Sequence, residues 1–127
     1  MENITSKNYV ENAVRTESDF SNALKRFTPL KVRLLHAGMG MCTEAGEFVD
    51  QLKKHLFYGT EIDLVNLSEE IGDVMWYCAL VMETLGISFD EVLTKNIIKL
   101  KQRYPGRFNE NGAINRDLEK ERELLEK

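Results

Sequence analysis

The sequence has little proline, little cysteine and no long apolar run, and each of these absences excludes a class of protein. Pro29 and Pro105 are its only prolines, and no stretch alternates apolar with polar residues as a half-buried strand does. No apolar segment approaches the roughly 20 residues that cross a bilayer, and the N-terminus lacks a signal-peptide core. These absences favour an all-α chain that does not insert into a membrane.

The cysteines indicate the cellular compartment of the protein, and the net charge indicates which classes of partner it can bind. Cys42 and Cys78 both fall inside helical patterns, which is typical of small buried hydrophobic residues in a reduced, cytoplasmic protein. A net charge of −4 provides no basic surface for nucleic acid or for an anionic membrane. We therefore expect no nucleic acid and no membrane among the partners.

Start and stop signals predict the helices. Thr28 before Pro29 begins a long helix, and Gly59 ends it. Thr60 is predicted to cap the next helix, and Ser88 begins the last main one with an S-x-x-E capping box. The predicted helices cover residues 7–17, 19–27, 29–57, 61–85 and 89–104.

These helices predict one antiparallel bundle of four to five helices in a single domain, 1–127. Its core is expected over about residues 9–108. The polar tail 109–127 has few apolar anchors, so we expect it to be peripheral or frayed.

Two similar acidic motifs stand on the two long helices. EAGE at Glu44–Glu47 and EIGD at Glu70–Asp73 each place two acids three residues apart, beside the apolar stripe of their helix. Because the offset from the stripe is the same in both helices, the two pairs converge or diverge together. Helical-wheel positions do not decide between a shared cleft and two solvated faces, which are the commoner arrangement for charged residues.

Four converging carboxylates would need a cation, since like charges oppose one another's ionisation. Oxygen-only ligation suits Mg²⁺ or Mn²⁺. A di-iron bundle would use Glu-x-x-His pairs, but neither His36 nor His55 follows a glutamate by three residues. Zinc is disfavoured because histidine and cysteine are not clustered.

Each acidic motif contains a glycine in mid-helix, which costs about 1 kcal/mol relative to alanine. Gly46 and Gly72 face away from the acids, so we expect another helix or a second subunit to pack closely at both. Gly40 lies on the acid side one turn before Glu44, where it would leave room for a ligand.

Polar residues that could bind an anion follow the acids along the chain. On the last main helix, Asn96, Lys99 and Arg103 form one stripe that could hold phosphate oxygens or a sugar hydroxyl, although such a stripe is more often solvated. Lys54 lies two turns after Glu47, and Tyr77 lies one turn after Asp73 on the same side. Both could reach a cleft between the helices.

The combined motifs resemble the MazG-like nucleotide pyrophosphohydrolases of the all-α NTP pyrophosphatase superfamily. The resemblance extends over roughly residues 9–108 and rests on three strings. They are G-x-x-x-E-A-G-E at 40–47, E-I-G-D-V-M-W-Y at 70–77 and N-I-I-K-L-K-Q-R-Y-P-G at 96–106.

The resemblance implies a single MazG-like module that dimerises or forms a dimer of dimers and hydrolyses a nucleoside triphosphate to the monophosphate and pyrophosphate. It implies that Glu44, Glu47, Glu70 and Asp73 hold Mg²⁺, or Mn²⁺ in its place, and that Glu44 or Glu47 activates water. The implied substrate-binding residues are Lys54, Tyr77, Asn96, Lys99 and Arg103. Two alternatives stay open: a dUTPase-like or dCTPase-like member of the superfamily, and a non-catalytic helical module that binds nucleotide or a partner.

Overall fold

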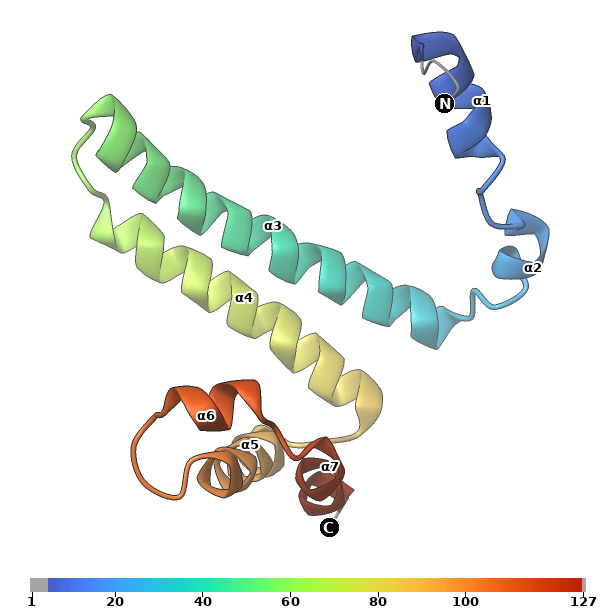
Figure 1. The fold of residues 1–127 in the computed structure, drawn as a ribbon. Coiled ribbons are helices and arrows are strands. Elements are labelled where there is room, and N and C mark those ends of the chain that lie inside the picture. The colour runs from blue at the N-terminus through green and yellow to red at the C-terminus, as the bar shows by residue number, and fades with distance from the viewer. Residues whose placement is uncertain (1–4, 127) are drawn as a thin grey trace. The chain divides into compact units, whose positions relative to one another are not determined.

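The computed structural model describes residues 5–126, and within them it contains seven helices and no strand (Figure 1). The expectation of an all-α chain is confirmed. The chain divides into two compact units, Met1–Val32 and Arg33–Lys127. The helices are α1 (Ser6–Val14), α2 (Phe20–Leu24), α3 (Pro29–Tyr58), α4 (Leu64–Leu85), α5 (Phe89–Arg103), α6 (Glu110–Ile114) and α7 (Leu118–Glu126).

The N-terminal unit contains two short helices and the first residues of α3. Thr5 caps α1 in a reciprocal capping box with Asn8, and Asp19 caps α2 by accepting a hydrogen bond from the backbone N–H of Ser21 at 2.9 Å. Both helices are shorter than the sequence predicted, and neither buries a residue. Helix α3 begins where it was predicted to begin, with the Thr28 hydroxyl accepting from the Lys31 N–H at 3.4 Å.

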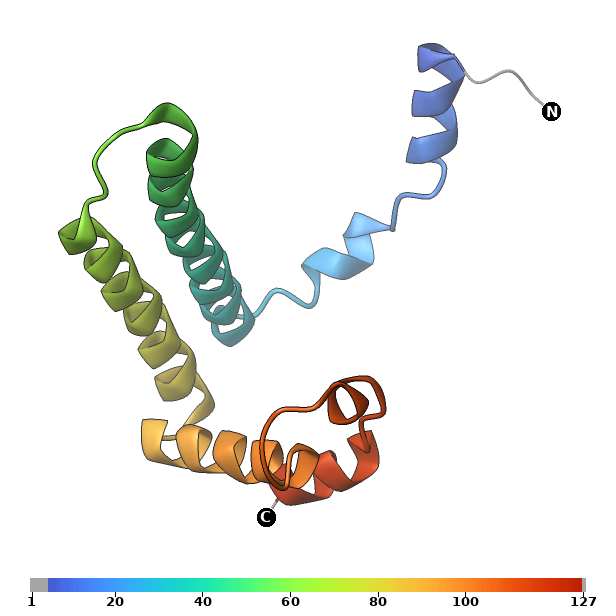
Figure 2. The same cartoon turned by 60° about the vertical axis from the view of Figure 1, so that its left-hand side comes forward.

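Helices α3 and α4 form an antiparallel hairpin, side by side in both views (Figures 1 and 2). Gly59, at φ +72°, ends α3 as predicted. The predicted start of α4 was wrong, because its cap is Asp63 and not Thr60. The Asp63 carboxylate accepts from two free backbone N–H groups, those of Val65 and Asn66, each at 3.0 Å, so the helix begins at Leu64.

The contact between α3 and α4 includes a pair of sulfur atoms. Ala37 has no exposed surface, and the thiol of Cys78 lies 3.6 Å from the sulfur of Met41. The apolar stripe predicted beside each acidic motif includes Leu56 on α3 and Ile71 on α4, and it is only partly covered, since Leu56 is 70% exposed and Ile71 53% exposed. Among residues 5–126, Ala37 is the one apolar side chain that the structure buries fully.

The tail was predicted to be peripheral or frayed, and it is not frayed, because α7 is a helix that packs along α5. Gly86 ends α4 with φ +68°, Ser88 caps α5 through the N–H of Glu91 at 3.1 Å, and α5 leaves α4 at an angle of 98°. At the other end of α5, Gly112 of α6 lies so close that an added Cβ would stand 2.8 Å from the carbonyl oxygen of Arg103. Few apolar residues anchor this tail, so sequence patterning missed the polar contacts that hold it.

Across the described part of the chain, no helix by itself has both the length and the apolar character to cross a bilayer. Helices α4 and α5 meet that test of length and composition only when taken together, across their 98° bend.

Candidate metal and nucleotide site

The acids of the two motifs converge on one another across the hairpin. Glu44 and Glu47 of α3 and Glu70 of α4 each offer a carboxylate oxygen, and these three atoms lie within 4.8 Å of one another. Glu70 is buried, at 5% exposed, whereas Glu44 is half-buried and Glu47 exposed. Packing of α3 against α4 therefore settles the question that the helical wheel left open.

Asp73, the fourth acid of the two motifs, contributes to the electrostatic environment of Glu44. The pKa of Glu44 is raised above its usual value, first by desolvation and then by the charges of Glu47, Asp73 and Glu70. Asp73 is exposed and stands outside the three-oxygen group, but its charge acts at the same place. The charges of the other three predicted metal ligands thus all act on Glu44.

This donor set fits a hard divalent cation. Mg²⁺ binds oxygen ligands at about 2.0–2.1 Å, and the three carboxylate oxygens, all within 4.8 Å of one another, lie near enough together to share one such ion. The set is all oxygen, contributed by two helices, and its negative charges repel one another until a cation neutralises them.

Sequence reasoning missed one polar residue beside this cluster. Asn66, one turn before Glu70 on α4, donates from Nδ2 to Glu70 Oε1 at 2.9 Å. Its own Oδ1 is buried and, among the described residues, has no hydrogen-bond partner. The signal in the sequence was an amide four residues before a predicted ligand, a spacing that brings two side chains together on a helix.

The structure corrects the interpretation of the glycines. Gly40 leaves no room for a ligand, because the ring of Tyr77 fills the space, and an added Cβ would stand 2.2 Å from Tyr77 Cε1 and Cζ. At Gly46 and Gly72 a Cβ would meet no atom of the described chain within 4 Å, so no other helix of this chain makes the packing contact predicted there, and contact with a second subunit stays a prediction. The close approach near the acidic motifs occurs at Gly40, against Tyr77.

Tyr77 itself packs between aromatic rings. Its ring meets His36 edge-to-face at a centroid distance of 5.8 Å and Trp76 at 4.9 Å. Its contacts with Gly40 and His36 belong to the joint between α3 and α4, so Tyr77 has a packing role whatever it contributes to a substrate.

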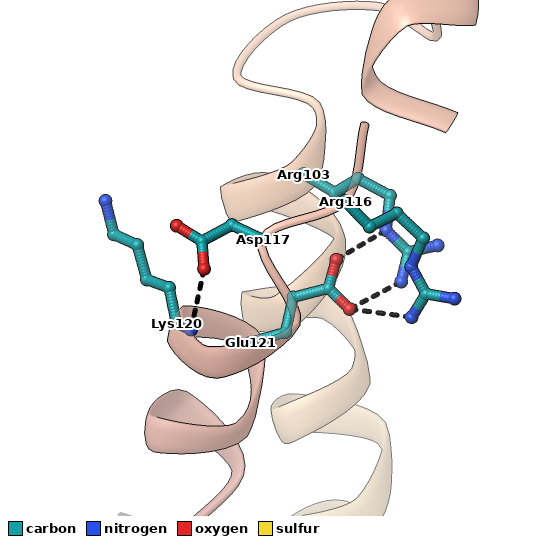
Figure 3. Close-up of polar contacts among 5 residues, drawn as sticks. All are labelled: Arg103, Arg116, Asp117, Lys120 and Glu121. Carbon is teal, nitrogen blue, oxygen red and sulfur yellow. Dashed lines mark hydrogen bonds and ion pairs between the residues drawn. The ribbon is translucent and has the colours of Figure 1, made fainter. Parts of the chain in front are cut away.

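Two of the predicted phosphate-binding cations are engaged by acids of the chain. Lys54 pairs with Asp50, one turn earlier on α3, with 2.8 Å between Nζ and Oδ2. Arg103 donates to both oxygens of Glu121 on α7, from Nε at 2.8 Å and from Nη2 at 2.7 Å (Figure 3). Arg116 adds a third hydrogen bond to Glu121 at 2.8 Å, as Figure 3 shows.

The carboxylate of this ion-pair cluster is almost fully shielded from solvent. The Glu121 side chain is 5% exposed and that of Arg103 is 15% exposed. Hydrogen bonds from Arg103 and then Arg116 hold the pKa of Glu121 down to about 2. Arg103 therefore fixes α7 to α5 in this structure, a role that the sequence motif did not reveal.

The other two members of the α5 stripe are placed differently. Asn96 is exposed and Lys99 half-buried on α5, the helix that leaves α4 at 98°. Among residues 5–126, the helix that α5 packs along is α7.

Comparison with known proteins gives a family for this hairpin. The model of the MazG nucleotide pyrophosphohydrolase domain matches residues 36–108, more than half of the chain, and the match includes all four acids. The chain belongs to the MazG family. Its MazG domain thus runs from the α3–α4 hairpin through α5, and α7 lies beyond the matched residues.

One curated relative of this MazG chain is the gene 37 protein of Mycobacterium phage L5. The two are 35% identical over 74 residues, which cover 55% of this chain and 65% of the phage protein. The match thus spans less than two thirds of that relative. No solved structure matches the chain.

Proposed function

We propose that this chain is a Mg²⁺-dependent nucleoside triphosphate pyrophosphohydrolase that releases pyrophosphate and a nucleoside monophosphate. The observation that carries the proposal is the convergence of Glu44, Glu47 and Glu70 from two helices, inside the residues that match the MazG domain. Glu44, Glu47, Glu70 and Asp73 would hold the cation, with Mn²⁺ as a possible substitute. Bound Mg²⁺ would supply charge neutralisation for the phosphates and a lowered pKa for water.

The chain's own residues would orient the reactants. Glu44 or Glu47 would accept a proton from the water that attacks the α-phosphorus, because Glu44 is half-buried and Glu47 exposed, whereas Glu70 is buried. Lys99 and Asn96 would contact phosphate or sugar. Lys54 and Arg103 could join them only by leaving Asp50 and Glu121, whereas Tyr77 could contact substrate without leaving its place beside Gly40.

The decisive experiment measures pyrophosphate release from a panel of ribo- and deoxynucleoside triphosphates with Mg²⁺ or Mn²⁺. Loss of a residue that only supports a metal ligand typically costs about 10–100-fold. Glu44→Gln and Asp73→Asn change predicted ligands themselves, so each should lower kcat by more than that. Glu69→Gln is the matched control, because Glu69 is an exposed acid beside Glu70 that stands outside the carboxylate group. Absence of turnover in the wild type, or full activity of both variants, would refute the proposal.

The same panel separates the related possibilities. Strong preference for dUTP or dCTP would indicate the dUTPase-like or dCTPase-like activity. Nucleotide binding without pyrophosphate release would indicate the non-catalytic module.

We further propose that the chain acts as a homodimer or as a dimer of dimers. Large apolar side chains on α4 are exposed to solvent: Trp76 is 57% exposed and Ile71 is 53% exposed. The faces at Gly46 and Gly72 are also uncovered within the chain. Sedimentation equilibrium should show a mass of two or four chains, and Ile71→Lys should lower that mass.

A further inference from the structure

The strongest polar feature outside the four acids is the buried, unpartnered oxygen of Asn66, which lies beside Glu70. Burial of a polar oxygen without a hydrogen bond costs free energy, so native structures seldom contain one. Asn66 Oδ1 is such an atom within residues 5–126, and its side chain is bonded at its other end to a candidate metal ligand.

The orientation of the Asn66 amide follows from chemistry. An ionised carboxylate only accepts hydrogen bonds, so the group that faces Glu70 Oε1 at 2.9 Å must be the NH₂. The carbonyl oxygen is consequently the one that lacks a partner. Reversing the amide would set two acceptors, Asn66 Oδ1 and Glu70 Oε1, against each other.

The backbone holds this amide in place. Asp63 caps α4 by accepting from the Asn66 N–H at 3.0 Å, which fixes the first turn of the helix. Asn66 and Glu70 then lie one turn apart on the same face. Glu70, at 5% exposed, is the most buried member of the three-carboxylate group, so its orientation depends on protein contacts more than that of Glu47 does.

We propose that Asn66 is a positioning residue of the metal site: its NH₂ holds the Glu70 carboxylate toward Glu44 and Glu47, and its free Oδ1 accepts a hydrogen bond from a water molecule that enters with the cation. The inference rests on the proposed function, since it assumes that the acids bind a divalent cation. Partners of this kind orient ligands, and their loss typically weakens metal binding by about 10–100-fold.

The test is a Mn²⁺ titration of the full chain in the absence of nucleotide, followed by water-proton relaxation or calorimetry. Asn66→Leu keeps the approximate shape without polar atoms, and Asn66→Ala removes the side chain. Both should raise the Mn²⁺ dissociation constant by about 10–100-fold. Asn115→Ala is the matched control, because the exposed Asn115, which follows α6, also donates a hydrogen bond from its side-chain amide, to Asn111 Oδ1 at 2.6 Å. It should leave the constant unchanged.

Thermal unfolding of the metal-free proteins separates positioning from plain structural support. If the Asn66 variants melt at a lower temperature yet bind Mn²⁺ as the wild type does, Asn66 is structural and the inference is wrong. A wild type that binds no Mn²⁺ overturns it together with the metal site. A wild type that binds Mn²⁺ but releases no pyrophosphate refutes the proposed activity alone, and the ratio of dissociation constants still decides the role of Asn66.

Discussion

Replacing Gly40 with alanine should destabilise the α3–α4 hairpin, although alanine is the better helix former. The added Cβ would lie 2.2 Å from two carbons of the Tyr77 ring. Carbon atoms in contact normally stand about 3.5–4 Å apart, so the ring or the helix would have to move by more than about 1 Å. Overpacking of this kind costs about 1–3 kcal/mol, against a gain of about 1 kcal/mol in helix propensity.

Gly46→Ala is the matched control on the same helix. A Cβ at Gly46 meets no atom of the chain within 4 Å, so this variant should keep the propensity gain without the clash. The free energies of unfolding of the two variants should then differ by about 1–3 kcal/mol, because the gain is common to both. Gly38→Ala serves as a second control, since its Cβ also meets nothing.

The assay is thermal unfolding followed by circular dichroism at one protein concentration, because association shifts the midpoint by mass action. For a chain of this size, 1 kcal/mol corresponds to about 4 °C. The clash should disappear when Tyr77 is first changed to alanine, which a double-mutant cycle measures. Gly40→Ala melting at or above the temperature of Gly46→Ala would refute the assigned contact.

Three further predictions concern the tail and α5. Glu121→Gln should lower the thermal midpoint and expose the amides of α7 to hydrogen exchange, because two arginines lose their common carboxylate. The pKa of Glu121 is lowered to about 2 in the folded chain, so its contribution is complete above its unfolded value near 4.5 and is lost as pH falls toward 2. Wild type should therefore lose more stability than Glu121→Gln over that range in acid melts. Lys99→Gln should raise the KM for nucleoside triphosphate about tenfold, whereas Lys101→Gln, which changes an exposed lysine of the same helix, should not; equal KM values would remove Lys99 from the binding set.

Local signals in the sequence determined the helices, because caps and terminators act within a few residues. Pro29, Gly59 and Gly86 stand where the structure begins or ends a helix. Asp63 shows the limit of such signals: Thr60 was predicted as the cap, and the hydrogen bonds from the backbone N–H groups of Val65 and Asn66 to Asp63 show that the helix begins three residues later.

The sequence likewise determined which acids could form a site, because residues three apart on a helix share a face. Whether the two faces met depended on how α3 packs on α4, which no pattern within one helix contains. Tertiary packing also placed the Tyr77 ring against Gly40 and left the helix faces at Gly46 and Gly72 uncovered within the described chain. It paired Arg103 with Glu121, 18 residues away, since contacts between side chains of different helices depend on where the chain returns and not on local periodicity.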